Sequence, residues 1–394
     1  MRYRRFSLLS LALLLGTLLW GYGSGRVDYR ALHRQAVVCD LHCDTVMRLL
    51  QGVELGVRGQ TGHVDIPRLN DGGIDLQVFA CWVDPRDVPA ESCAFQAHRM
   101  IDALYDQFRA NSESITLART ASQAEEIVAA GQIAAVLAIE GGHAIENSLD
   151  TLRAFHDRGV RSMSLTWNNS LPWADAAADT APKHGGLTDF GKKIVRTMNE
   201  IGMIIDVSHV ADSTFWDVIE TTTDPIIASH SCVHALCPHH RNLRDDQIRA
   251  IARNGGMIGI NFYSAFLDST FGRKYRVLRA QYRAEIDSLW EAHKDDRDRY
   301  IQQRDALLGE EFHAIRPPVD RVIDHIDYIV RLVGPEHVGL GSDFDGTTGL
   351  PRGLEDCSKV PVITRKLLER GYAEEDIRAI LGGNFLRVFR KVCG

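Results

Sequence analysis

Residues 133–143 have the sequence Ile-Ala-Ala-Val-Leu-Ala-Ile-Glu-Gly-Gly-His, in which seven apolar residues are followed directly by Glu140. An uninterrupted apolar run of about four to eight residues is typical of a strand that is buried on both faces of a parallel sheet. The carboxylate at the end of the run is notable, because a buried charge is costly unless it is paired or bound to a metal. This stretch therefore predicts a parallel sheet with a polar site at the carboxyl ends of its strands.

The same apolar pattern occurs seven more times along the chain. The eight predicted strands are Ala36–Cys39, Leu76–Val83, Ile133–Ile139, Ser162–Leu165, Met203–Val207, Pro225–Ala228, Met257–Ile260 and Val338–Leu340. Helical patterns separate most of them, for example at Ala94–Asn111, Thr188–Ile201 and Asp320–Val333. Strands that alternate with helices predict an α/β fold, a (β/α)8 barrel of the TIM type. A doubly wound open sheet is the competing fold, but its Gly-x-Gly-x-x-Gly motif follows none of the runs.

Residues that can bind metals follow five of the eight runs. They are His42 and Asp44 after the first run, Glu140 after the third, His209 after the fifth, His230 after the sixth and Asp343 after the eighth. The carboxyl ends of all strands meet on one face of such a barrel. Residues spread over most of the chain are therefore expected to converge on one pocket.

The spacing of these residues predicts a centre of two metal ions. His42 and Asp44 are two residues apart on an extended segment, so their side chains leave the same side and can bind one ion. His209 and His230 come from successive strands and can share a second ion, with the Glu140 carboxylate as a bridge. Three imidazoles and two carboxylates suit zinc, although cobalt and manganese would also be accepted. Two zinc ions would activate a water molecule and polarise a carbonyl group.

Ten motifs, in the order found along the chain, resemble the membrane dipeptidase (renal dipeptidase) family of zinc peptidases, which belongs to the metal-dependent amidohydrolase barrels. The resemblance extends from about Val37 to the carboxyl end. It rests on Asp40-Leu-His-Cys-Asp44, His63-Val-Asp-Ile-Pro-Arg-Leu69, Ile139-Glu-Gly-Gly-His143, Pro172-Trp-Ala-Asp175, Gly186-Leu-Thr-Asp-Phe-Gly191, Asp206-Val-Ser-His209, Ser229-His-Ser231, His240-Arg-Asn242, Asn261-Phe-Tyr263 and Ser342-Asp-Phe-Asp-Gly346.

The resemblance implies a function for the barrel. It implies hydrolysis of dipeptides at a binuclear zinc site, with a D-residue often accepted at the carboxyl position, in a protein that is commonly a homodimer. The family's metal ligands fall on His42, Asp44, Glu140, His209 and His230, with Glu140 as the bridging residue. This set agrees with the one that the order of the strands predicts.

The resemblance also assigns roles around the metals. Arg241 matches the residue that holds the terminal carboxylate of the dipeptide, for which a guanidinium group is suited; its alternative role is a surface salt bridge. Tyr263 matches a tyrosine that contacts substrate. Asp343 matches an aspartate that handles the proton given to the leaving amine, or alternatively orients a ligand histidine. Asp345, His143 and Ser208 are expected to have supporting or structural roles.

Trp167 departs from the family pattern. Mammalian members have a histidine at this position, which is thought to stabilise the oxyanion, whereas this chain has Leu165-Thr-Trp-Asn-Asn169. An indole N–H can donate one hydrogen bond but cannot carry a charge or a proton. Trp167 is therefore expected either to supply a donor to the substrate or to form a wall of the pocket.

Other functions are compatible with parts of this pattern. A related metal-dependent amidohydrolase that acts on a β-lactam, a lactone or an acyl-amino acid would need the same metal centre. A non-enzymatic zinc-binding barrel would be expected to have lost Asp343 or a ligand, and neither is lost. A phosphoesterase is disfavoured because the chain has no phosphate-binding loop.

Residues 1–25 predict an export signal. Three arginines lie within Met1–Arg5, and a mostly apolar run of about 15 residues follows at Phe6–Trp20. The segment is either cleaved or kept as a membrane anchor, and residues 26–394 form the dipeptidase barrel domain. The barrel is thus expected outside the cytoplasm, in the periplasm, outside the cell or attached to a membrane.

Cys39 and Cys81 lie within apolar runs and are expected to act as small buried hydrophobic residues.

Two further features limit the partners and the shape of the molecule. The net charge of 45 − 52 = −7 argues against a nucleic-acid partner, which usually requires a basic excess. A charged stretch of helical periodicity, about Arg273–Glu311, lies between the seventh and eighth strands. It predicts a helical excursion of one or two surface helices near the mouth of the pocket. This excursion is expected to be a solvated element, a lid over the substrate or a dimer contact.

Overall fold

The computed structural model of the chain describes residues 27–89 and 92–394. The predicted export signal at residues 1–25 lies outside these ranges. None of the helices within them has the length and hydropathy of a membrane-spanning segment.

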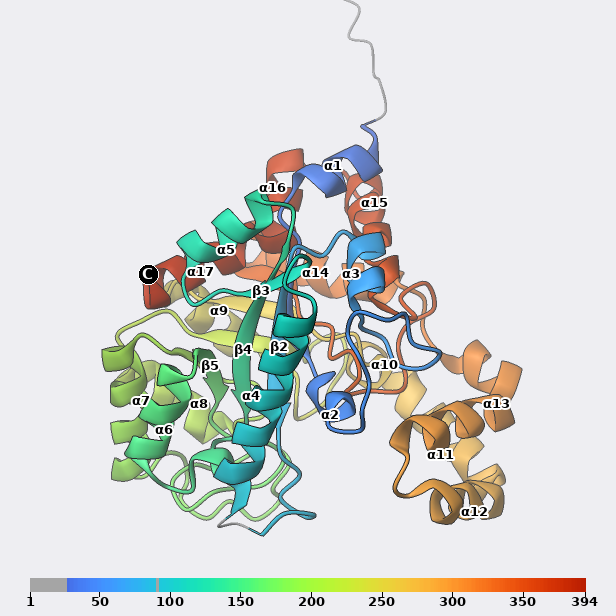
Figure 1. Cartoon of the computed structure of the whole chain (residues 1–394), viewed down its shortest axis with the longest axis horizontal. Helices are drawn as coiled ribbons and strands as arrows, with labels where there is room; N and C mark the ends of the chain where they lie inside the picture. Colours follow the sequence, from blue (N-terminus) through green and yellow to red (C-terminus); the bar gives the residue numbers. More distant parts are fainter. Residues whose placement is uncertain (1–26, 90–91) are drawn as a thin grey trace, which may run out of the picture.

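Eight parallel strands close into a barrel, as the sequence predicts, with helices around it (Figure 1). In order around the barrel, the strands are β1 (Cys39–Cys43), β2 (Leu76–Trp82), β4 (Ile133–Glu140), β5 (Val160–Ser164), β6 (Ile204–Asp206), β7 (Ile227–Ser231), β8 (Met257–Ile260) and β9 (Val338–Leu340). The ring closes where β1 pairs with β9, through Asp40 and Leu340. The prediction of a (β/α)8 barrel is confirmed.

Three strands differ most from the prediction, and one of them is β7, which occupies Ile227–Ser231 instead of the predicted Pro225–Ala228. The first strand was predicted at Ala36–Cys39 but occupies Cys39–Cys43. It continues through polar residues because Asp40, for example, accepts hydrogen bonds from Ser342 and Gln77, two partners far away in the sequence. A short additional strand, β3 (Ile115–Leu117), pairs with the start of β4 and was not predicted, because three residues carry too little pattern.

The three named helices agree with their predictions to within one residue at each end. They are α4 (Cys93–Ala110), α7 (Asp189–Ile201) and α14 (Asp320–Val333). Thr188 begins α7, where its hydroxyl accepts a hydrogen bond from the N–H of Gly191. The other helices outside the excursion are α1 (Tyr29–Gln35), α2 (Val46–Leu49), α3 (Ile66–Gly72), α5 (Ala121–Ala129), α6 (Leu149–Asp157), α8 (Asp212–Thr221), α9 (Asp245–Arg253), α10 (Ser264–Leu267), α15 (Pro361–Glu369), α16 (Glu374–Arg378) and α17 (Asn384–Cys393).

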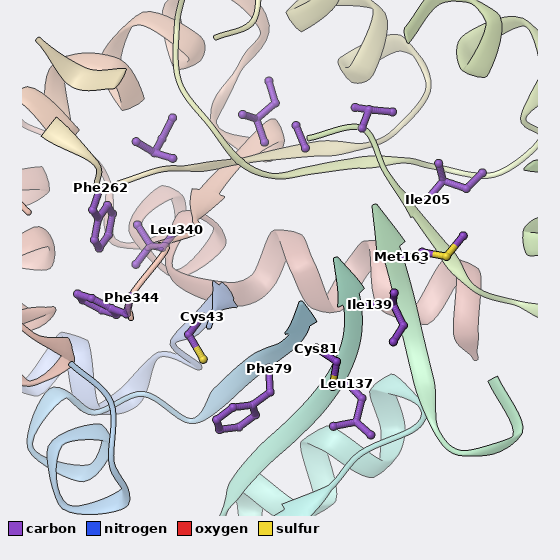
Figure 2. Packing of buried hydrophobic residues seen from close by; sticks show 14 of the residues in the cluster. Cys43, Phe79, Cys81, Leu137, Ile139, Met163, Ile205, Phe262, Leu340 and Phe344 are labelled. Carbon is purple, nitrogen blue, oxygen red and sulfur yellow. The ribbon is translucent and has the colours of Figure 1, made fainter. Parts of the chain in front are cut away.

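The alternation of side chains along β4 separates two apolar clusters and determines where Glu140 points. Ala134, Val136 and Ala138 belong to a cluster that includes Phe385 and Phe389 of α17. The intervening residues 135, 137 and 139 belong to a larger cluster under the surrounding helices, part of which is shown in Figure 2. Because the side-chain period of a strand is two, Glu140 leaves β4 on the same face as Ala138. Cys39 and Cys81 are fully buried in these clusters, as predicted.

The helical excursion between β8 and β9 contains three helices rather than one or two. They are α11 (Ser269–Gln281), α12 (Arg283–His293) and α13 (Arg297–Ile315), which project to one side of the barrel (Figure 1). The excursion has its own apolar cluster, formed by Phe271, Leu278, Ile286, Leu308 and Phe312. This cluster makes the excursion a packed unit and not only a solvated surface.

Candidate metal centre and active site

The first half of the site joins β1 to β4. The Nε2 atom of His42 lies 3.5 Å from Oδ2 of Asp44 and 3.4 Å from Oε2 of Glu140. All three side chains are buried. His42 and Asp44 thus point to the same place from one strand end, as the two-residue spacing predicts, and Glu140 meets them from β4.

The second half of the site joins Glu140 to β6 and β7. Its other carboxylate oxygen, Oε1, lies 3.0 Å from Nε2 of His209 and 3.7 Å from Nε2 of His230. The two oxygens of Glu140 therefore face two different sets of imidazoles. This is the geometry of a carboxylate that bridges two cations.

Neighbouring side chains determine which nitrogen of each imidazole carries the proton. Nδ1 of His209 donates a hydrogen bond to Oδ1 of Asn168 at 3.0 Å. The single hydroxyl proton of Ser229 is given to Asp206, so Nδ1 of His230 donates to Oγ of Ser229 at 2.7 Å. Both Nε2 atoms are therefore left with a lone pair, which is the form that binds a metal.

The two lone pairs need a cation between them. Nε2 of His209 and Nε2 of His230 lie only 3.0 Å apart and face the same carboxylate oxygen. Nε2 of His42 and Oδ1 of Asp44 are buried and have no hydrogen-bond partner among the described residues. Such atoms are costly unless something binds them. The five residues therefore fit metal ions well, in both halves of the site.

The pKa directions agree with metal binding. Burial lowers the pKa of His209 to about 3 and that of His230 well below its ordinary value, so both imidazoles are neutral. Burial raises the pKa of Glu140, but the charge of His42 outweighs it and holds the pKa well below its ordinary value. Burial lowers the pKa of His42, but the charge of Glu140 and the contacts with Asp44 raise it well above its ordinary value. The carboxylates of Glu140 and Asp44 thus favour a positive charge at His42.

Asp343 lies beside these ligands at the end of β9. One of its oxygens falls in a group with His42 and Asp44 that could hold a metal ion, and Nδ2 of Asn261 donates to Oδ2 of Asp343 at 2.9 Å. Burial raises the pKa of Asp343 to about 8, with a further contribution from the charge of Asp44. A carboxyl group with this pKa can carry a proton near neutral pH. The backbone φ of Asp343 is +62°, an uncommon conformation for a residue other than glycine.

Arg241 lies beside the end of β7, which carries His230. Its guanidinium group is buried, which contradicts the alternative of a surface salt bridge. Nη1 donates to Oγ of Ser231 at 3.5 Å and Nη2 donates to the carbonyl of His230 at 3.3 Å, while Nε has no partner among the described residues. Burial lowers the pKa of Arg241, partly offset by the charges of Asp343 and Glu140. Arg241 is thus a buried cation, and the N–H donor at its Nε is not used by any described residue.

Two groups of aromatic side chains lie near the site, one around Trp167 and one around Tyr263. The ring of Trp167 packs against Trp82 with 4.8 Å between their centroids, and the guanidinium group of Arg86 lies 5.5 Å from the Trp167 ring. Trp167 is 6.5 Å from the ring of His209. Tyr263 packs edge-on against Phe266 and Phe271. These contacts place Trp167 among packed aromatic and basic side chains beside His209.

The expected supporting residues have identifiable partners. Ser208 accepts a hydrogen bond from the N–H of His230 at 3.1 Å, and Nε2 of His143 donates to the carbonyl of Val83 at 2.8 Å. Asp345 accepts hydrogen bonds from Thr45 and from the N–H of His63, both at 2.7 Å. None of these contacts involves a ring nitrogen of the three ligand imidazoles.

Four important residues were not assigned a role from the sequence. Asp206 and Ser229 orient His230, Asn168 orients His209, and Asn261 binds Asp343. All four lie within three residues of a candidate site residue, and that proximity is the signal that could have identified them. Gly346 is a fifth case, because an added Cβ atom would collide with the carboxylates of Asp44 and Asp343.

Comparisons with known proteins give a consistent picture. The family described as membrane dipeptidase (peptidase family M19) matches residues 27–393. Dipeptidase aclJ of Aspergillus oryzae is 33% identical over 84% of this chain and 70% of its own length. Dipeptidase 3 of Rattus norvegicus is 30% identical over 92% of this chain and 66% of its own length. The crystal structure of a metallopeptidase from Rhodobacter sphaeroides, liganded with a phosphinate mimic of L-Ala-D-Ala, is similar with a TM-score of 0.74 and 26% identity, covering 91% of this chain and 99% of that one.

Proposed function

The chain belongs to the membrane dipeptidase family, peptidase family M19, and is a metallodipeptidase; we propose that it works with two zinc ions. We assign one ion to His42, Asp44 and Glu140 and the other to Glu140, His209 and His230. The observation that carries this assignment is the position of Glu140, whose two oxygens face different imidazoles. When bound, two zinc ions supply an activated water and a Lewis acid for the peptide carbonyl.

The residues of the chain have separate tasks in the proposed reaction. Arg241 binds the terminal carboxylate of the dipeptide through its free guanidinium donors. Asp343 gives a proton to the leaving amine, for which its place beside the ligands is suited. Asn261 holds the Asp343 carboxylate in place through the hydrogen bond to Oδ2.

The position of Arg241 beside the proposed ligand His230 would limit the substrate to short peptides. Arg241 is fixed by contacts with Ser231 and with the carbonyl of His230, which is itself a proposed ligand. A carboxylate bound there lies close to the metals, so only one peptide bond fits between the two. We propose that a D-residue is accepted at the carboxyl position. The L-Ala-D-Ala mimic bound by the Rhodobacter sphaeroides metallopeptidase supports this substrate class.

The proposed activity can be tested with purified protein of the 26–394 segment. Zinc-loaded protein is expected to bind about two zinc ions per chain and to cleave dipeptides with L- or D-residues at the carboxyl position. Chelation is expected to abolish cleavage, and zinc to restore it. A folded, zinc-loaded protein that cleaves no dipeptide would contradict the proposal. Hydrolysis of a β-lactam, a lactone or an acyl-amino acid in parallel assays would then indicate the alternative amidohydrolase activity.

We further propose that the chain is exported and forms a homodimer. The arginine-rich and apolar segment at residues 1–25 supports export, with cleavage or retention as a membrane anchor. Fractionation of cells that express the full chain tests the location. Light scattering of the purified 26–394 segment tests the dimer, because a mass equal to one chain would contradict it.

A further inference from the structure

The excursion contacts the barrel close to the proposed metal centre. At the start of α13, the Asp298 carboxylate accepts three hydrogen bonds from Arg48, which follows β1 in the sequence by five residues. The distances are 3.2 and 2.9 Å from Nε and 2.7 Å from Nη2. Thr61 adds a hydrogen bond to the same carboxylate at 2.8 Å. This bidentate arrangement fixes the guanidinium group more firmly than a single contact would.

The same guanidinium group faces a second carboxylate. Nη1 of Arg48 lies 3.6 Å from Oδ2 of Asp345, whose side chain is only 1% exposed. Arg48 itself is 8% exposed, and Asp298 is 20% exposed. Arg48 is therefore a buried cation between an acid of the excursion and an acid of the barrel. Its removal would leave two acids close together without their cation, which is strongly unfavourable for a buried pair.

Asp345 belongs to the tight turn that carries Asp343. Both residues have positive φ angles, +62° at Asp343 and +65° at Asp345. Such a conformation costs free energy for a residue other than glycine and persists only where neighbouring contacts hold it. The contacts of the Asp345 carboxylate with Arg48, Thr45 and the N–H of His63 supply this restraint.

The turn is also bonded to the strand end that carries two proposed ligands. The N–H of Asp343 donates to the carbonyl of His42 at 3.1 Å, and the N–H of Asp44 donates to the carbonyl of Phe344 at 2.8 Å. Gly346, at the end of the turn, packs against the carboxylates of Asp44 and Asp343 with no room for a Cβ atom. A shift of the turn would therefore change the position of Asp343 relative to the ligands.

From these contacts we propose that Arg48 is a positioning residue, which docks the excursion through Asp298 and, through Asp345, holds Asp343 at its place beside the metal ligands. The inference rests on the proposed dipeptidase activity and adds a task for the excursion. The excursion is then part of the active-site scaffold rather than a separate surface element. A displacement of about 1 Å in a reacting group can reduce a rate by about a hundredfold, so a remote contact of this kind can affect turnover strongly.

A pocket beside Arg48 offers a sharp test of the proposal. Its volume is about 240 Å³, and it is lined by residues that include Arg48, Thr61, Arg297, Asp298 and Asp345. If Arg48 is shortened to alanine, the space adjoins two carboxylates and can admit a free guanidinium ion. Guanidinium at concentrations far below those that unfold proteins should then take the place of the lost group.

The experiment uses zinc-loaded protein of the 26–394 segment with the substitution Arg48→Ala. We expect kcat to fall by about tenfold, with KM and bound zinc changed by less than about twofold. Guanidinium is expected to restore at least half of the lost kcat and to leave the unsubstituted protein unaffected. Hydrogen exchange, measured without substrate, is expected to be faster at residues 343–347. Should Arg48→Ala fail to fold, Asp298→Asn removes the negative partner and keeps its shape.

The matched control is Arg390→Ala. Arg390 of α17 pairs with Glu125 of α5, and both side chains are about half exposed. This substitution also removes an arginine that joins two elements, but α17 packs against the amino-terminal ends of the strands. We expect kcat, and exchange at residues 343–347, to stay unchanged.

Two results would overturn the positioning role. One is a folded Arg48→Ala protein with unchanged kcat, and the other is unchanged exchange at residues 343–347. An unsubstituted protein that is inactive on every dipeptide would instead count against the proposed function. The exchange experiment would still decide the positioning role in that case, since it needs no substrate.

Discussion

The side-chain amide of Asn261, at the end of β8, donates a 2.9 Å hydrogen bond to the carboxyl group of Asp343, at the end of β9. Asn261 also accepts a hydrogen bond from the N–H of Tyr263 at 2.6 Å. One buried amide thus joins the proposed proton carrier to the segment that carries the proposed substrate-contacting tyrosine.

Replacing this amide should reduce turnover. We expect Asn261→Ala to lower kcat by about tenfold or more, because Asp343 loses the donor that orients it. Steady-state kinetics with zinc content as a reference measures the effect. The control is Asn254→Ala, which removes a hydrogen bond to the N–H of Ile226 before β7 begins. The control variant should have a lower melting temperature but an unchanged kcat per folded molecule. An equal loss of kcat in both variants would contradict the role of Asn261.

Ser229→Ala should weaken metal binding at the His209–His230 side. The substitution removes the group that fixes the proton on Nδ1 of His230. Loss of such a partner typically reduces metal affinity by about 10- to 100-fold. Zinc titration by calorimetry measures this change. Ser162→Ala, at another buried serine of the barrel, is the control and should bind zinc as the unsubstituted protein does.

Arg241→Ala should raise KM for dipeptides by about a hundredfold, since a charged hydrogen-bonded pair with the substrate carboxylate is lost. The same dipeptides with an amidated carboxyl end provide the internal comparison. The unsubstituted protein should strongly prefer the free carboxylate, and the variant should not. A variant that keeps the preference would show that another residue binds the carboxylate.

Trp167→Phe separates the two roles that the sequence left open for Trp167. The packing of Trp167 against Trp82 and Arg86 favours the wall, because a phenyl ring can keep much of this packing. We therefore expect kcat to stay within about threefold of its original value, whereas loss of an oxyanion donor would reduce kcat by about a hundredfold. The second outcome would assign the donor role to the indole N–H.

Asp75 should make stability depend on pH. Burial raises the pKa of Asp75 from its ordinary value to about 6, although the carboxylate accepts a hydrogen bond from the N–H of Val38. A carboxyl group with a raised pKa in the folded protein favours folding when protonated, so this stability is lost as the pH rises through about 6. Asp75→Asn keeps the acceptor without the charge. We expect it to raise the free energy of unfolding by about 1–2 kcal/mol at pH 7 but little at pH 4, as denaturant titration at both pH values can measure.

The barrel was predictable because its strands are buried on both faces. Runs such as Ile133–Ile139 are continuous and apolar, so their number and order could be read directly. The first strand was displaced because the burial of Asp40 depends on Ser342, about 300 residues later. No local pattern carries that information.

The candidate site was partly predictable for a related reason. Barrel topology alone brings His42, Asp44, Glu140, His209 and His230 together, because each lies at the carboxyl end of a strand or just beyond it. The contacts that orient them depend on side-chain geometry, as the hydrogen bond from His209 to Asn168 shows. The contact between Arg48 and Asp298 joins residues 250 positions apart and could not be found from spacing.

The closure of the barrel between β1 and β9, with α17 packed below it, has a consequence for the synthesis of the protein. The ribosome produces β1 near the beginning of the chain and β9 and α17 at its end. The core can be completed only after nearly the whole chain has been made, because Phe385 and Phe389 of α17 belong to the cluster that contains Leu76 and Val136. Pairings this distant in sequence form slowly. Newly made chains should therefore remain open until the residues of α17 have been made.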